Sequence, residues 1–113
     1  MCTKNQLFTI TDAIALKAKD IFSDSLDSVI LYGSYARGEE TAESDIDILI
    51  LVNKSAQELS AYKKSFSLLS SELGLEYDIL VSVTLKDSET FYRYINAVPF
   101  YSNVSKEGIK IAV

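Results

Sequence analysis

Apolar residues along this chain form short continuous runs that are typical of buried β-strands. We expect strands at Val29–Tyr32, Asp45–Val52 and Leu75–Val83, and a last extended segment at Ile109–Val113 that follows Gly108. In the segments between these runs, apolar residues recur every three or four positions, which indicates helices. The alternation predicts an α/β (α+β) fold in which a small mixed sheet is backed by helices.

Two of the expected helices carry clear apolar stripes. The first should begin at Asp12, as its N-cap, and end near Ser23. Ser55 and Glu58 form a capping box that begins the second, and Gly74 supplies its C-terminal stop. The stripes consist of Ile14, Ala18, Ile21 and Phe22 in the first helix and of Leu59, Tyr62, Phe66, Leu69 and Leu73 in the second.

The C-terminal part of the chain is rich in aromatic residues. We expect a helix over Ser88–Ala97, an interruption at Pro99 and a short helix through Lys106. The aromatic residues are Phe91, Tyr92, Tyr94, Phe100 and Tyr101. They suit a binding surface, where Tyr and Phe are enriched, but ordinary packing of a terminal helix explains them equally well.

Composition and charge narrow the class of protein. The 113 residues are 48% hydrophobic and 24% charged, which is ordinary for one globular domain spanning residues 1–113. We expect a cytoplasmic protein, because the chain has no apolar run of the ~18–20 residues that cross a membrane and no secretory signal. Cys2 is the only cysteine, so no internal disulfide can form.

Two absences bear on the chemistry. The chain has no histidine, which excludes a histidine general base and the usual zinc sites. The net charge of −5, with eleven scattered basic residues, argues against direct binding of nucleic acid.

The most informative segment is Gly33–Val52, which reads GSYARGEETAESDIDILILV. Gly33 allows a sharp turn after the first strand and a close approach of a ligand to the main chain. Ser34 then begins a short helical turn, whose free N–H groups and dipole attract anions. The segment therefore predicts a site for phosphate groups at this turn.

The same segment places two carboxylates on one face of the second strand. Asp45 and Asp47 are two residues apart, and side chains at this spacing point in the same direction. Mg²⁺ is usually bound by one or two carboxylates together with substrate phosphates. The turn and the aspartates together predict a site for a metal–nucleoside triphosphate complex.

This segment resembles the signature of the minimal nucleotidyltransferase family, within the DNA polymerase beta-like nucleotidyltransferase superfamily. The matching residues are Gly33, Ser34, Ala36, Arg37, Gly38, Ser44, Asp45 and Asp47. The resemblance implies a polymerase beta-like nucleotidyltransferase fold and a third carboxylate from a later strand. We expect that carboxylate to be Asp78, which precedes an apolar run, and regard Glu76 on the same face as the weaker candidate.

The resemblance also implies a mechanism with ATP as substrate and two Mg²⁺ ions. Asp45 and Asp47 are expected to hold Mg²⁺ against the triphosphate, and Asp78 to share a second ion and to help deprotonate the attacking hydroxyl. Gly33 and Ser34 are expected to hold the β and γ phosphates. Arg37 either neutralises charge on the leaving group or pairs with a nearby glutamate, and both interpretations stay open. The candidate glutamates are Glu39, Glu40 and Glu43.

The acceptor of the nucleotide is not readable from the residues. Stand-alone members of the family imply a partner protein, commonly a HEPN-family ribonuclease toxin, whose tyrosine hydroxyl receives AMP while the nucleotidyltransferase acts as antitoxin and forms an oligomer with it. Two alternatives remain: a module that masks its partner without catalysis, and a small-molecule nucleotidyltransferase that completes its acceptor site by dimerisation.

Overall fold

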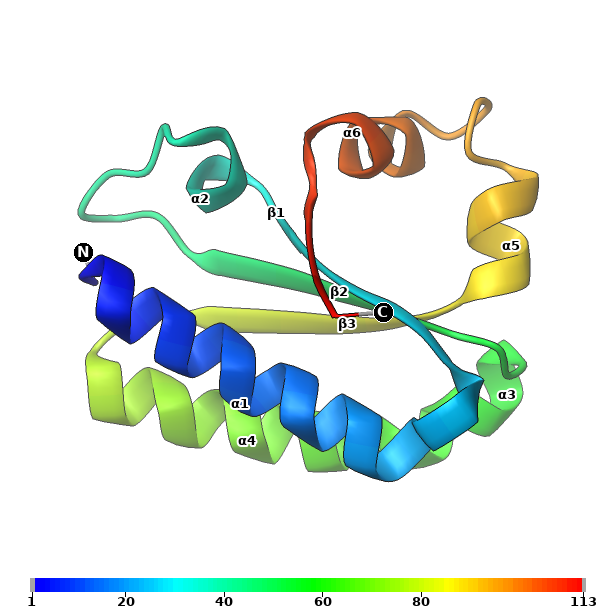
Figure 1. Cartoon of the computed structure of the whole chain (residues 1–113), viewed down its shortest axis with the longest axis horizontal. Helices are drawn as coiled ribbons and strands as arrows, with labels where there is room; N and C mark the ends of the chain where they lie inside the picture. The colour runs from blue at the N-terminus through cyan, green and yellow to red at the C-terminus, as the bar shows by residue number, and fades with distance from the viewer. Residues whose placement is uncertain (1, 113) are drawn as a thin grey trace.

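The computed structural model describes residues 2–112 and contains one four-stranded mixed sheet with helices on both faces (Figure 1). The strands are β1 (Leu26–Tyr32), β2 (Ile46–Val52), β3 (Val81–Asp87) and β4 (Ile109–Ala112), in the order β3-β2-β1-β4. β1 is antiparallel to both β2 and β4, whereas β2 and β3 are parallel. The predicted class, a mixed sheet backed by helices, is confirmed.

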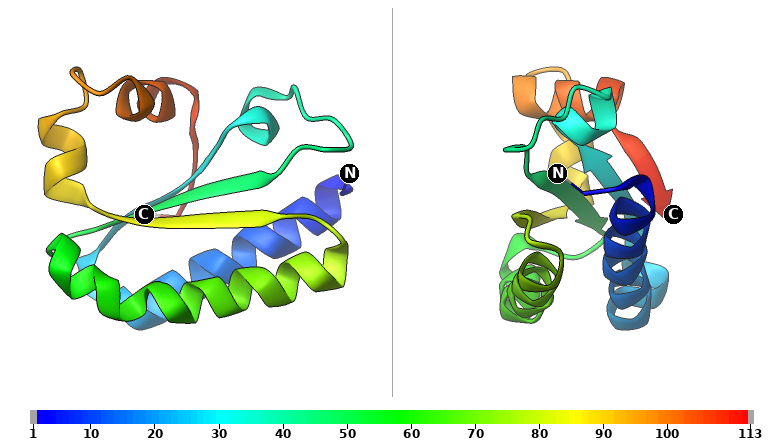
Figure 2. Two further views of the ribbon diagram at one scale, coloured as in Figure 1. Left: turned by 180° about the vertical axis from the view of Figure 1, so that it is seen from behind. Right: turned by 90° about the vertical axis from the view of Figure 1, so that its left-hand side faces the viewer.

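Two long helices, α1 (Lys4–Phe22) and α4 (Lys63–Tyr77), cover one face of the sheet (Figure 2). The even-numbered residues of β2 point to this face and form the centre of the larger hydrophobic core. The predicted stripes supply much of the rest: the buried members are Ile14, Ala18, Phe22, Leu59, Phe66 and Leu73. Burial of these large apolar side chains is the main stabilising contribution to the fold.

The opposite face carries the short helices α2 (Ser34–Arg37), α5 (Ser88–Arg93) and α6 (Pro99–Glu107). A smaller core lies beneath α5 and α6, and its buried members are Ile30, Leu49, Leu51, Phe91 and Val104. Of the aromatic residues near the C-terminus, some are packed in the core and others are exposed to solvent, as a binding surface would require. Phe91 is buried and Tyr101 packs on this core, whereas Tyr92, Tyr94 and Phe100 are more than 40% exposed.

The predicted start of the first helix is wrong. α1 begins at Lys4, directly after the N-cap Thr3, which forms a capping box with Gln6; the Gln6 N–H donates to the Thr3 hydroxyl at 3.1 Å. Asp12 therefore lies inside the helix rather than at its start. The 3-10 turn Ser23–Ser25 follows α1 at the predicted end.

The predicted start of the second helical segment is confirmed, and its predicted end is wrong. Ser55 and Glu58 form the expected capping box at α3 (Ala56–Leu59), which continues through the 3-10 turn Ser60–Tyr62 into α4. α4 runs past Gly74 to Tyr77. Gly74 is needed for a different reason: a Cβ there would lie 2.8 Å from the carbonyl oxygen of Ile79, where the chain folds back on the helix.

The strand predicted at residues 75–83 is therefore too early. Its first three residues complete α4, Asp78 caps that helix in the left-handed conformation at φ 52°, and β3 begins at Val81. The C-terminal elements begin where predicted, since α5 starts at Ser88, α6 starts at Pro99 and β4 follows Gly108, but α5 ends at Arg93 and not at the predicted Ala97. Val113, the end of the predicted extended segment, lies outside the described residues. Within residues 2–112, no helix combines the length and apolar character needed to span a membrane.

Candidate active site

The turn between β1 and α2 has the predicted form. Gly33 is the N-cap of α2, with φ 79° and ψ −159°, a conformation that is essentially restricted to glycine. Its carbonyl accepts hydrogen bonds from the N–H groups of Ala36 and Arg37, at 3.1 and 3.2 Å. α2 is one turn long and ends at Gly38 in the left-handed conformation. The first N–H groups of a helix have no partner within it, so this turn can donate to a bound anion.

The carboxylate of Asp47 packs directly against this turn. A Cβ at position 33 would lie 2.5 Å from Oδ2 of Asp47, closer than real side chains approach. Only glycine therefore lets the turn and the carboxylate occupy adjacent positions. A phosphate held by the turn would lie next to this carboxylate.

Asp45 lies close enough to Asp47 to affect its titration. Burial raises the pKa of Asp47, the negative charge of Asp45 raises it further, and Arg37 lowers it. Asp45 directly precedes β2 rather than belonging to it, and both aspartates are partly buried. Two carboxylates that repel each other beside a glycine turn fit a divalent cation, which would neutralise both.

The residue on each side of Asp47 in the sheet is a hydroxyl-bearing one. Tyr32 on β1 and Ser82 on β3 are its register partners. All three side chains point to the face that carries α2, because their strand neighbours Leu31, Ile48 and Val83 belong to the core on the other face. Burial raises the pKa of the Tyr32 hydroxyl, and the nearby Asp47 charge raises it further, so Tyr32 stays protonated at neutral pH.

Arg37 projects from α2 at the rim of the site. Its side chain is exposed and forms ion pairs with Glu39 at 2.7 Å and with Glu107 of α6 at 3.4 Å. Of the three glutamates proposed as partners, Glu39 is the one that the structure pairs with it. Arg37 also lowers the pKa of Asp47, so its charge acts on the carboxylate pair as well.

A pocket of about 250 Å³ opens between the glycine turn and α6. Tyr32 and Phe100 meet edge-to-face on its wall, with ring centroids 5.4 Å apart. The remaining lining residues are Gly33, Arg37, Asn103, Val104 and Glu107. No local pattern in the sequence links α6 with the glycine turn, because they are brought together by the pairing of β1 with β4, which are remote in sequence.

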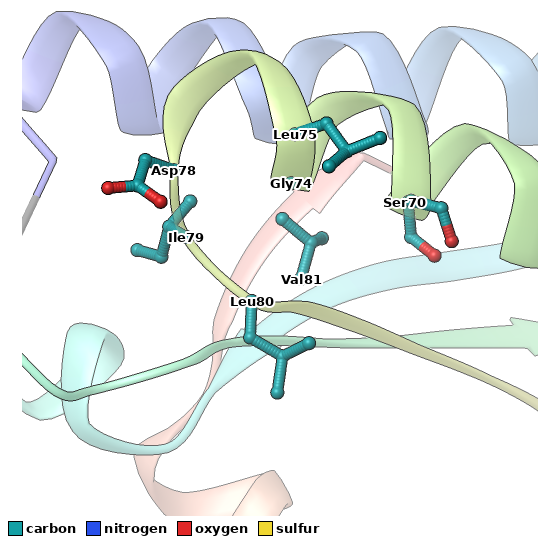
Figure 3. A pocket seen from close by; sticks show the side chains of 8 residues that line it. Ser70, Gly74, Leu75, Asp78, Ile79, Leu80 and Val81 are labelled. Carbon is teal, nitrogen blue, oxygen red and sulfur yellow. The ribbon is translucent and has the colours of Figure 1, made fainter.

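The structure does not bring Asp78 to the other two aspartates. Asp78 is an exposed residue at the C-terminal end of α4, on the layer opposite α2, and its carboxylate points away from Ser70 and Leu75 in Figure 3. It borders a separate groove of about 480 Å³ between α4 and the start of β3. Glu76 lies on α4 and is exposed as well. Over residues 2–112, no group of three or more acidic or cysteine side chains is arranged to hold a metal ion.

Comparison with known proteins agrees with this architecture. The sequence profile of the nucleotidyltransferase domain family matches residues 13–111. Two proteins of Methanocaldococcus jannaschii, both named as candidate protein adenylyltransferases, are similar to this chain. One is 38% identical over 80% of this chain and 84% of its own length, and the other is 36% identical over 83% and 84%.

Solved structures show the same fold at low sequence identity. A nucleotidyltransferase-like protein from Sulfolobus solfataricus matches with a TM-score of 0.52 and 21% identity, over 92% of this chain and 78% of that one. A toxin–antitoxin complex with AMP-PNP matches with a TM-score of 0.52 and 19% identity, over 88% and 70%. The turn at Gly33, the aspartates beside it and these matches lead to one conclusion: the chain belongs to the nucleotidyltransferase domain family and is a nucleotidyltransferase.

Proposed function

We propose that this protein transfers AMP from ATP to a hydroxyl group of a partner protein, with Mg²⁺ as cofactor. The observation that carries the proposal is the contact between the Asp47 carboxylate and the Gly33 turn. It places a cation-binding group and an anion-binding group side by side, as a metal–triphosphate complex requires.

In this proposal Asp45 and Asp47 hold the cation, and Gly33 and Ser34 donate to the β and γ phosphates. Bound Mg²⁺ supplies neutralisation of charge on the triphosphate during displacement at the α-phosphorus, with pyrophosphate as the leaving group. Arg37, freed from its exposed pairs with Glu39 and Glu107, adds positive charge at the same rim. Asp78 is left out, because it lies at the end of α4.

The names of the similar proteins support a protein acceptor. The M. jannaschii relatives are named as candidate protein adenylyltransferases, and the fold is shared with a toxin–antitoxin complex. We therefore assign the chain to the antitoxin side of a cytoplasmic toxin–antitoxin pair. Its partner is a HEPN-family ribonuclease toxin, and the acceptor is a tyrosine hydroxyl of that toxin. The net charge of −5 makes direct binding of nucleic acid unfavourable.

The test uses, as the candidate acceptor, the protein encoded by the gene next to the gene for this chain. It is incubated with this protein, ATP and Mg²⁺, then separated, and its intact mass and ribonuclease activity are measured. We expect one or more added AMP groups and a toxin that stays inactive after separation, because a covalent bond outlives the complex. Asp47→Asn should bind the partner but leave its mass unchanged.

Two other results would redirect the assignment. An unmodified toxin that regains full activity after separation would identify a masking module. AMP found on a small molecule, and not on the toxin, would identify a small-molecule nucleotidyltransferase.

A further inference from the structure

The position beside Asp47 on the neighbouring parallel strand is occupied by Ser82. β2 and β3 pair in a continuous register from Ile46 with Val81 to Val52 with Asp87, which sets Asp47 against Ser82. Neighbouring strands lie about 4.8 Å apart, so Ser82 is the β3 residue nearest to the carboxylate. Ser82 is exposed on the face that carries α2, where a ligand can reach it.

Asp78 has a structural role that keeps it away from this position. Its left-handed conformation ends α4, and its N–H donates to the carbonyl of Gly74. The N–H of Ile79 donates to the same carbonyl at 3.1 Å, which closes the turn. To stand beside Asp47, Asp78 would have to move four residues along β3, from position 78 to position 82, and the last turn of α4 would have to unwind.

We propose that the active site binds a single divalent cation, held by Asp45 and Asp47 with the triphosphate. In this proposal the neutral Ser82 stands at the position where a third carboxylate would have to lie to hold a second cation. This inference rests on the proposed function. A second cation needs a further anionic ligand on its free side, because two adjacent dications repel each other. In the described residues, the groups that flank Asp47 in the sheet are the neutral hydroxyls of Tyr32 and Ser82.

One consequence concerns the attacking hydroxyl of the acceptor. With Asp78 in the other layer, residues 2–112 place no third carboxylate beside Asp45 and Asp47 that could remove that proton. A cation held by Asp45 and Asp47 would supply charge neutralisation at the α-phosphate. The proton of the attacking hydroxyl would pass to a group of the acceptor protein or to water.

The test counts bound cations directly. Mn²⁺ is titrated into the protein saturated with α,β-methylene ATP, an analogue that cannot transfer AMP, and bound Mn²⁺ is measured by electron paramagnetic resonance. We expect one Mn²⁺ per chain in the wild type. Asp78→Asn should leave both the number and the affinity unchanged, whereas Asp47→Asn should weaken Mn²⁺ binding at least tenfold.

Ser82→Asp supplies the missing carboxylate and should raise the count to two. The matched control is Thr84→Asp, which adds the same charge on the same face of β3, about 7 Å further along the strand, and should leave the count at one. Circular dichroism checks that each variant is folded. The wild-type and Asp78→Asn counts decide the question even if Ser82→Asp does not fold.

Two Mn²⁺ ions in the wild type that fall to one in Asp78→Asn would overturn the inference and would mean that β3 begins four residues earlier. Failure of the wild type to bind the analogue with Mn²⁺ would overturn the proposed function itself. The two failures are therefore distinguishable, because the first keeps nucleotide binding and the second loses it.

Discussion

At the level of single residues, the turn at Gly33 and the carboxylate of Asp47 constrain each other. Gly33 combines a glycine-only backbone conformation with a neighbour 2.5 Å from any Cβ, whereas Gly38, at φ 71°, has open space around it. The two glycines of one short motif therefore differ in what they tolerate. Glycine is required at position 33 by both its backbone conformation and the neighbouring Asp47, whereas at position 38 it is favoured only by the backbone conformation.

This difference predicts unequal effects of substitution. Gly33→Ala should lower the free energy of unfolding by about 3 kcal/mol and abolish nucleotide binding, because it strains the backbone and displaces Asp47. Gly38→Asn should cost less than about 1 kcal/mol, since asparagine tolerates the left-handed conformation. Urea unfolding and binding of ATP with Mg²⁺ measure both effects. Equal losses in the two variants would show that Asp47 does not depend on the space at position 33.

Asp47 should lower the stability of the metal-free fold at neutral pH. Its pKa is raised in the folded state by burial and by Asp45, so the folded protein binds its proton more tightly than the unfolded chain. The ionised carboxylate therefore destabilises the fold. This cost grows as pH rises through the folded-state pKa and disappears below the ordinary carboxyl pKa.

Asp47→Asn should consequently raise the free energy of unfolding at pH 7 in the absence of metal by on the order of 0.5 to 1 kcal/mol. The melting temperature should rise with it. The gain should vanish near pH 3.5, where both side chains are neutral. The control is Asp20→Asn, which makes the same charge change at an exposed position of α1. Thermal melts at the two pH values decide it, and a variant that melts below the wild type at pH 7 would contradict the burial argument.

At the level of elements, the sequence predicted correctly those features that depend on residues close together in the chain. The β1 turn, the Ser55 capping box and the β2 run were all predicted, because each depends on residues within one or two turns of chain. The true start of α1 was also readable, since Thr3 and Gln6 form a capping box in sequence. The apolar stripe drew attention to its later half.

The end of α4 shows a case that the sequence could not settle. A glycine after a helical stripe usually marks a helix end, and residues 75–83 have the composition of a strand. In the structure the same glycine instead makes room for the returning chain at Ile79. The decision between the two depends on the pairing of β2 with β3, which is a tertiary contact. The position of Asp78 depends on where α4 ends. Asp78 was the predicted site residue with the weakest local sequence pattern, and it is the one that the structure places away from the other two aspartates.

At the level of the whole molecule, the sheet separates stability from function. α1 and α4 bury the larger core on one face, while the aspartates, the glycine turn and α6 lie on the other (Figure 1). The site face can therefore keep repelling carboxylates and exposed aromatic residues without opening the main core. A ligand that binds there should stabilise the complete fold, because the site is assembled from β1, β2 and α2 only in the folded chain.

This arrangement predicts that ATP and Mg²⁺ stabilise the protein together and not separately. Without the cation, the carboxylates of Asp45 and Asp47 repel the triphosphate, and without the triphosphate, Mg²⁺ has too few ligands. At a concentration 100 times the Kd, the pair should add about 2.7 kcal/mol of stability. For a domain of this length, that corresponds to a rise in melting temperature on the order of 10 °C.

A thermal melt with ATP alone, Mg²⁺ alone and both measures the effect, and the Asp47→Asn variant is the control that removes the coupling. Because the variant keeps the glycine turn and loses one charge that repels the triphosphate, it should gain a small shift with ATP alone, while the joint shift disappears. A full shift with ATP alone in the wild type would show that the aspartates do not act through a cation. A joint shift that survives in Asp47→Asn would place the cation elsewhere on the chain.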